Sequence, residues 1–485
     1  MTHAPRSAPA RLAALALTAV TLALALAACR VGPNYHAPAT PKGAGGPLLS
    51  LNPDAETAEP SPDAWWRLYE DARLDGLVGE ALKANRDLAA ADANFAAARA
   101  VLTAAHAARY PSTVASAGGL YGRDAVTDEI LELGGQPPQT IWLFEDIFQA
   151  AYEVDLFGRV HRSIEAANAN ADAVAAARDD VKVVVAAETA RAYAAICALG
   201  QELAVARHSL DVVSNEAQIT AHRRDAGGDS DYDVARAQAL VAQVRASIAP
   251  LEGQRRAAIY ELAAVLGRTP ADAPTDLESC VVPPSLKSLL PVGDGAALLK
   301  RRPDVRQAER RLAAATADIG VATADLYPTI RLAGLYGGAA TQLSQLNNNI
   351  GRTWGVGPEI SWSFPNMAGP RARVRQAKAA QAAALASFDG VVLSALKETE
   401  QALALYAAAI DNRQSLGEAR DQIHTAYRIA HDQVLAGSLS NLDLLTTEQT
   451  LVALDAAVAA SDASLVEDQI AVFKALGGGW QGDAR

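Results

Sequence analysis

The sequence AGGDSDYD at residues 226–233 and the sequence AGSLSNLD at residues 436–443 share the pattern Ala-Gly-x-x-Ser-x-x-Asp. Each follows one long stretch of helical character and precedes another. Glycine readily adopts the left-handed conformation that ends a helix, and serine followed three residues later by an acidic residue is a common helix start. Both stretches therefore predict the tip of a hairpin between two long helices.

The helices that flank the tips are predicted at residues 159–226, 231–266, 369–436 and 441–476. The first of them contains no proline, and Gly200 is its only glycine before the tip. At about 1.5 Å per residue this helix would be roughly 100 Å long. A compact globular domain rarely accommodates such a length, so the sequence predicts an elongated molecule.

The chain also repeats itself at an offset of 217 residues, since Leu82-Lys83 matches Leu299-Lys300 and Tyr110-Pro111 matches Tyr327-Pro328. Each half is predicted to contain a helix, a β-hairpin, a long helix, a tip and a helix. The first helix is expected from Leu74 to about Arg109. The predicted strands are 112–123, 140–156, 329–341 and 352–364, and residues 124–139 are predicted to form a solvent-exposed loop.

These features divide the mature chain into a leader and two repeats. The expected segments are a leader at 29–70, repeat 1 at 71–267, a connector at 268–293, repeat 2 at 294–476 and a tail at 477–485. Four strands cannot close a membrane barrel, in which every backbone polar group must be paired. Three chains would supply twelve strands, an even number typical of outer-membrane barrels, although two or four chains also satisfy this requirement. Aromatic residues near the strand ends fit membrane interfaces, but they also fit the core of a soluble sheet.

The N-terminus resembles a targeting segment. Arg6 and Arg11 precede an apolar run at residues 12–28, which is typical of a signal peptide and short for a membrane span. The run ends in Leu26-Ala27-Ala28-Cys29, which resembles a bacterial lipobox and predicts lipidation of Cys29 after removal of residues 1–28. An ordinary secretory signal is the alternative. Trp65 and Trp66 are expected to hold the leader against the folded body.

Composition narrows the classes of function. The formal net charge of -12 argues against a nucleic-acid partner. Apart from Cys29 the chain has Cys197 and Cys280; a disulfide between them is conceivable, but two unpaired cysteines are predicted. His424 and His431 are interpreted as ordinary helix positions, and two methionines are too few for a soft-metal relay. We expect no enzymatic activity, no cofactor and no metal site.

Several motifs together resemble the TolC/OprM-type outer-membrane efflux proteins, and most closely their NodT-type lipoprotein branch. They are the lipobox, VGPNY at 31–35, EVDLFGR at 153–159, RRPDV at 301–305 and the two tips. The resemblance implies an α+β membrane protein, in which a trimeric 12-stranded β-barrel continues into a long α-helical coiled-coil barrel. It also implies a homotrimer in outer-membrane lipid, a periplasmic adaptor protein and an inner-membrane transporter of the RND type.

The resemblance assigns roles to the tips as well. Asp443 would form an acidic ring at the periplasmic aperture, and Asp233 is the corresponding acid of the first tip, although each also suits a helix cap. A second ring is not expected because its place is Thr446, and the family's Tyr–Arg lock falls on Val434 and Leu439. The candidates for adaptor docking are Gly227, Ser230, Gly437, Ser440 and Leu442. Two other functions stay open: a channel for type I protein secretion, and a lipid-anchored periplasmic scaffold without a pore.

Overall fold

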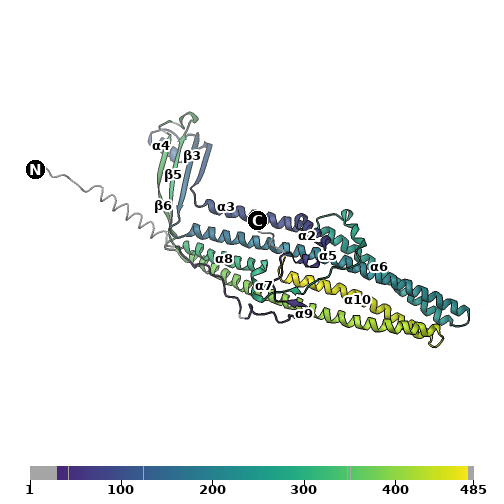
Figure 1. Ribbon diagram of the computed structural model, residues 1–485. Coiled ribbons are helices and arrows are strands. Elements are labelled where there is room, and N and C mark those ends of the chain that lie inside the picture. Colours follow the sequence, from purple (N-terminus) through teal and green to yellow (C-terminus); the bar gives the residue numbers. More distant parts are fainter. Residues whose placement is uncertain (1–29, 42, 124, 347, 350, 479–485) are drawn as a thin grey trace. The chain divides into compact units, whose positions relative to one another are not determined.

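The computed structural model describes residues 30–478 except residues 42, 124, 347 and 350 (Figure 1). The predicted signal peptide at 1–28, the lipidation site Cys29 and residues 479–485 of the predicted tail lie outside the described residues. The chain forms two compact units. Unit 1 comprises the residues up to 38 together with 96–173 and 309–387, and unit 2 comprises 39–95, 174–308 and the residues from 388 onward.

Unit 1 contains an antiparallel sheet of four strands in the order β2-β3-β5-β6. The strands are β2 Ser112–Gly122, β3 Ile141–Val154, β5 Thr329–Ala340 and β6 Arg352–Ser361. The predicted strands are therefore confirmed to within three residues at each end. Among the described residues, β2 and β6 each pair along only one edge, so two long strand edges are left open.

The two faces of this sheet differ in chemistry. Residues directly opposite in an antiparallel pair share a face, and the register places Tyr121 beside Trp142 and Tyr336 beside both Phe148 and Trp354. The mostly apolar face carries Tyr121, Trp142, Phe144, Phe148, Tyr152, Leu332, Tyr336, Trp354, Val356 and Ile360, and it also carries the charged Asp146 and Arg352. The other face carries Ser116, Glu145, Gln149, Glu153, Arg331 and Glu359 among several aliphatic side chains.

The prediction of a structureless loop at 124–139 is wrong in part, because α4 (Ala125–Leu133) forms there. Asp128 holds the helix to both strand ends: it accepts hydrogen bonds from the Arg123 side chain at 2.9 Å and from the Gln139 backbone at 3.2 Å. Gly135 then ends the segment with a φ of 73°. The glycine and proline pairs of this region, which disfavour a helix, all lie after residue 133. The nine residues before them can therefore form one.

A buried arginine fixes the first described residues of the leader within unit 1. Arg162, which is 2% exposed, donates hydrogen bonds to the Asn34 side chain at 2.7 Å and to the backbone oxygens of Val31 and Gly32. Gly320 makes room for it, since a Cβ at that position would lie 2.7 Å from the Arg162 side chain. The VGPNY segment is therefore fixed by side-chain contacts.

The helices account for most of the chain. They are α2 Ala72–Ala84, α3 Arg86–Ala107, α5 Arg159–Asp225, α6 Asp231–Val265, α7 Gly295–Arg301, α8 Pro303–Ala324, α9 Ala368–Leu435 and α10 Asn441–Ala475. The long helices around the tips are confirmed. The single helix predicted at 74–109 is wrong, because Asn85 divides it: its side chain accepts from the Asp87 and Leu88 backbones and donates to Val265.

Unit 2 has an extensive apolar core in which the end of the leader takes part. Trp65, in the 3₁₀ turn η1 (Trp65–Tyr69), is fully buried and stacks on Phe473 of α10 with 4.7 Å between ring centroids. Trp66 is also buried. A short parallel pair, β1 (Glu56–Thr57) with β4 (Leu290–Pro291), ties the leader to the connector. The predicted role of the two tryptophans is confirmed.

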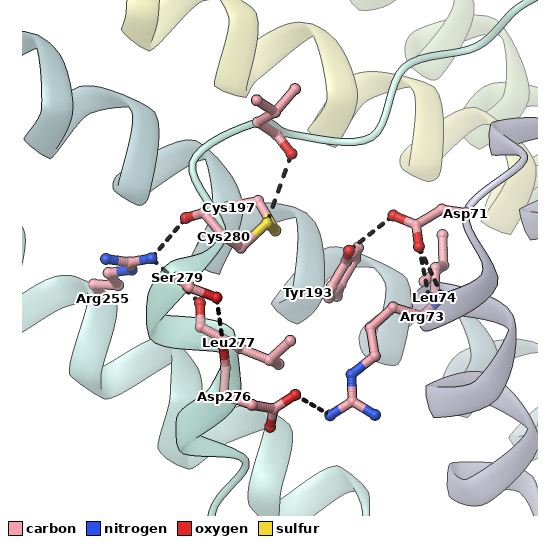
Figure 2. The surroundings of a disulfide bond; sticks show 11 residues. Asp71, Arg73, Leu74, Tyr193, Cys197, Arg255, Asp276, Leu277, Ser279 and Cys280 are labelled. Carbon is pink, nitrogen blue, oxygen red and sulfur yellow. Dashed lines mark hydrogen bonds and ion pairs between the residues drawn. A yellow bond between two sulfur atoms is a disulfide. The ribbon is translucent and has the colours of Figure 1, made fainter.

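The prediction that Cys197 and Cys280 are unpaired is wrong, because they form a disulfide across 83 residues with their Cα atoms 4.8 Å apart (Figure 2). The connector folds back onto α5 through the 3₁₀ turns η2 (Pro270–Asp272) and η3 (Thr275–Ser279). Arg255 of α6 holds this return by donating to the backbone oxygens of Leu277 and Cys280. Nothing in the spacing of the two cysteines indicates that the connector returns to α5.

Three described helices, α5, α9 and α10, contain stretches long and apolar enough to cross a membrane by length and composition. Alanine supplies much of that hydropathy. The most apolar stretch of α5 is 72% buried inside the chain, which is the behaviour of a helix that packs against other helices.

Candidate functional site: the two hairpin tips

Both tips lie in unit 2, and their backbones turn in the same way. Gly227 has a φ of 81° and Gly437 a φ of 72°, which are left-handed values that strain other residues. In each tip the glycine N–H bonds three residues back, and the next N–H, of Gly228 or Ser438, bonds five residues back. This pair of hydrogen bonds is the Schellman motif, so both long helices end as the sequence predicts.

The following helices start with the predicted serine caps. Ser230 and Ser440 each accept a hydrogen bond from the backbone N–H three residues on, at 3.2 Å in both tips. In the first tip Asp233 accepts the reciprocal bond from the Ser230 backbone at 3.1 Å. The hydrogen bond from the Ser230 hydroxyl, followed by this backbone bond, holds the pKa of the Asp233 carboxyl below its usual value. In both tips the serine hydroxyl donates to the aspartate at 2.6 Å, and in the first tip Asp233 also completes a capping box with Ser230.

The surroundings of the two tips are different. Charged groups surround the first: Arg224 pairs with Asp231 at 2.8 Å, and the Arg236 guanidinium lies over the exposed Tyr232 ring. Apolar contacts support the second, since Val434 is 3% exposed and Leu444 is 1% exposed. The cluster under this tip consists of Ala430, Val434 and Leu444, with Tyr427 and Leu439 packed against it.

Val434 and Leu439 are the positions at which the resemblance would have placed a Tyr–Arg lock. Here Val434 belongs to the apolar cluster under the second tip, and Leu439 packs against that cluster. The contacts under this tip are therefore apolar, and full burial of a side chain such as Val434 or Leu444 is worth roughly 1.5–3 kcal/mol.

A buried asparagine joins the two tips. Asn441, the first residue of α10, is 6% exposed and donates to the Thr220 hydroxyl at 3.0 Å and to the Asp229 carboxylate at 3.3 Å. Asp229 also pairs with Arg223 at 3.4 Å. The sequence does not predict this bridge, because Asn441 stands inside the turn motif and nothing local indicates that it contacts α5.

The residues predicted to dock an adaptor lie on the outer surface of the tips. Gly227, Ser230, Gly437 and Ser440 are exposed, and Leu442 is 40% exposed although it is apolar. Asp443 is exposed as well. The structure thus leaves these groups accessible to a second molecule or to the same tip of another copy.

The histidines singled out in the sequence do not form a ligand set. His424 is exposed, and His431 lies 3.8 Å from Asp432 and beside the Tyr427 ring. Over the described part of the chain, no group of three or more His, Cys, Asp or Glu side chains could hold a metal ion.

Comparison with known proteins connects this arrangement to a family. The family model of the outer membrane efflux proteins matches residues 77–268 and 296–478. Nodulation protein T of Rhizobium leguminosarum bv. viciae is 29% identical over 96% of this chain and 93% of its own length. Outer membrane protein OprJ of Pseudomonas aeruginosa is 29% identical over 96% of both chains.

Solved structures agree with the sequence relatives. The outer-membrane channel OprN superposes with a TM-score of 0.86 at 34% identity, covering 94% of this chain and all of OprN. The open state of the MtrE outer membrane channel of Neisseria gonorrhoeae gives a TM-score of 0.81 at 26% identity, over 94% of this chain and all of MtrE. These neighbours are α+β channel proteins rather than enzymes, and they place this chain in the outer membrane with its helices as a periplasmic extension. The chain belongs to the outer membrane efflux protein family.

Proposed function

We propose that this chain is the outer-membrane channel of a tripartite efflux pump that passes small molecules from the periplasm, or from an inner-membrane transporter, to the exterior. The observation that carries the proposal is the sheet of unit 1, which has one mostly apolar face and two open edges. The same chain carries two capped helical tips that are exposed.

The dimensions of the apolar face support a membrane span. On β3 it runs from Trp142 to Tyr152, which is about 33 Å along a strand at roughly 3.3 Å per residue. A strand tilt of about 40° turns this into a height of roughly 25 Å, the usual height of the apolar band of an outer-membrane barrel. Stacked aromatic pairs, Trp142 with Phe144 and Trp362 with Phe364, fit the two interfacial girdles.

The open edges support assembly of several copies. An unpaired strand edge cannot face lipid, because its N–H and C=O groups would lack partners. If β2 of one copy pairs with β6 of the next, three copies make a closed barrel of twelve strands. The polar face, with Glu145 and Glu153 among its charged residues, would then line an aqueous channel. We therefore propose a homotrimer.

The order of elements supports an origin from two repeats. Shifting α3 by the predicted offset of 217 residues reproduces the bounds of α8. Shifting α6 by 210 residues reproduces the bounds of α10. We propose that residues 71–267 and 294–476 are the repeats, with 268–293 as the connector between them, and that six tips surround the opening of a trimeric coiled-coil barrel.

The tips are the proposed contact with the rest of the pump. Gly227, Ser230, Gly437, Ser440 and Leu442 would dock a periplasmic adaptor protein, which in turn meets an inner-membrane transporter of the RND type. Asp443, with Asp233 in the other tip, would place negative charge at the aperture. Three such charges around a narrow opening favour cations.

Anchoring of the chain by a lipid completes the proposal. One relative, SilC of Salmonella typhimurium, is described as a probable outer membrane lipoprotein and is 27% identical over 96% of this chain. We propose Cys29 as the acceptor, followed by the leader that Arg162 fixes to unit 1. Replacing Cys29 with alanine should abolish incorporation of labelled palmitate into the mature protein.

The assembly can be tested by cross-linking the open edges. In a Cys29→Ser background, Ser116→Cys on β2 is combined in turn with Thr353→Cys, Gly355→Cys or Gly357→Cys on β6. We expect at least one pair to give a dimer and trimer ladder after oxidation, while Ser116→Cys alone gives none. The purified trimer should also conduct ions in a planar bilayer. A chain that stays soluble without detergent, gives no ladder and does not conduct would instead be the periplasmic scaffold.

Cargo is tested separately in cells that lack the chain. Return of the wild-type chain should restore export of small toxic compounds, and exchange of both tips for an unrelated helical turn should abolish it while trimers still form. Restored secretion of a protein, without any effect on small molecules, would favour the channel of a type I secretion system.

A further inference from the structure

Two buried carboxylates lie just beneath the tips. Glu448 of α10 is 1% exposed, and neither of its carboxylate oxygens accepts a hydrogen bond from any residue that the structure describes. Glu216 of α5 is 6% exposed and near enough for its charge to act on Glu448. A buried carboxylate without partners is costly when ionised, so its presence calls for an explanation.

The pair lies between two apolar layers. Leu444, one helical turn before Glu448, belongs to the cluster under the second tip, and Val452, one turn after it, packs against the next cluster. On α5, Glu216 follows Val213 of that same cluster by three residues. This next cluster consists of Val213, Leu240 and Val244, with Leu210, Val241 and Val452 against it. Both carboxyl groups therefore lie within the packed interior of the helical hairpins.

Charged and titratable groups from α5, α9 and the first tip surround the pair. Burial raises the pKa of Glu216; His431 of α9 and Arg223 of α5 act against this rise, whereas Asp229 of the first tip adds to it. Tyr427 of α9 also lies close, since both glutamates act on its hydroxyl. None of these groups donates a hydrogen bond to Glu448 in the described structure.

We propose that Glu216 and Glu448 form a proton-binding pair that sets how firmly the two tips are packed. With a proton on the pair, α5 and α10 pack closely and Asn441 can join the tips. When the carboxylic acid releases that proton to water, two buried carboxylates are left near each other, and Glu448 has no hydrogen-bond donor among the described residues. Their repulsion loosens α5 from α10 beneath both tips.

The sign of the pH dependence follows from burial. Burial first, and the neighbouring Glu216 second, raise the pKa of Glu448 from its ordinary value of 4.5 to about 7. A raised carboxyl pKa means that the packed state holds a proton that the loosened state gives up. Packing is therefore firm below about pH 4.5 and weakens as the pH rises to about 7. The opening constant is the equilibrium constant for loosening α5 from α10 beneath the tips. In this window it grows by up to tenfold per pH unit.

Hydrogen exchange measures this directly on the full-length protein in detergent. Exchange is followed in peptides covering residues 208–220 and 441–452 between pH 5.5 and 7.5, after correction for the intrinsic dependence of exchange on pH. In the wild type we expect the opening constant to rise by about tenfold or more over this range. In Glu448→Gln, which carries no charge, the constant should change less than twofold.

Two further variants make the result decisive. Glu467→Gln removes an exposed carboxylate from the same helix and should keep the full response. Glu448→Leu removes the buried polar group altogether and should show no response even if the Gln variant packs poorly. A wild type that shows no pH dependence, or a response that survives in both Glu448 variants, overturns the proposal. Because exchange reports on the tips without any export, this outcome is independent of whether the chain is an efflux channel.

Discussion

The disulfide between Cys197 and Cys280 should contribute most of the stability of the connector. It closes a loop of 83 residues that contains the tip half of α5, the first tip and α6. The loss of chain entropy in the unfolded state corresponds to about 4.5 kcal/mol for a loop of this length. In a unit as large as unit 2, roughly 1.5 °C of melting temperature corresponds to each kcal/mol, so reduction should lower Tm by about 7 °C.

The assay compares oxidised and reduced protein in a Cys29→Ser background, so that no other cysteine contributes. Thermal unfolding is followed by circular dichroism at a fixed scan rate, because membrane proteins of this size often unfold irreversibly. The double variant Cys197→Ala/Cys280→Ala serves as the control. Its Tm should match that of the reduced protein and should not change with reductant.

Two results would refute this reasoning. Oxidised protein that reacts with two equivalents of a thiol reagent under denaturing conditions has no disulfide. A Tm that is equal in both redox states would mean that the contacts around the connector, such as those of Arg255 and the Arg73–Asp276 pair, already hold it without the bond.

Three other predictions concern the tips and the core. Asp443→Asn should lower the cation preference of single channels while costing less than about 1 kcal/mol, because a negative charge in the first turn of a helix contributes only roughly 0.3–1 kcal/mol; unchanged selectivity would exclude an acidic ring. Asn441→Ala removes one buried and one partly buried hydrogen bond and should speed hydrogen exchange in both tips about tenfold, in line with a loss of roughly 1–2 kcal/mol; an effect confined to the second tip would contradict their coupling. Trp65→Ala should destabilise unit 2 by about 3–5 kcal/mol, because it leaves a large cavity beside Phe473, and this is measured as a fall in Tm.

The parts that the sequence predicts well are those governed by local chemistry. Gly227 and Gly437 are needed for left-handed turns, and Ser230 and Ser440 cap the next helices, so short motifs identify both tips. The strands are also predicted well, since Pro111 and other turn residues bound stretches with high β-propensity.

The parts that the sequence does not predict depend on long-range contacts. Asn85 breaks a helix because its side chain both caps α3 and reaches Val265, which is 180 residues away. The disulfide depends on the path of the connector, and the Asn441 bridge depends on α5 lying beside α10. Such contacts leave no periodic signal, and polar residues that make them look like ordinary surface residues of an Ala-rich helix.

The two tips should therefore differ in how easily they change shape. The contacts of the first tip are largely solvent-exposed ion pairs, such as Arg224 with Asp231, which salt screens and which add little stability. The second tip rests on buried aliphatic side chains that must be exposed to water before it can move. A partner therefore needs less free energy to move the first tip. The hydrogen bond from Asn441 to Asp229 connects such a movement directly to the start of α10. Because Asp443 lies two residues further along α10, a change that begins at the polar tip would reach the proposed aperture through this asparagine.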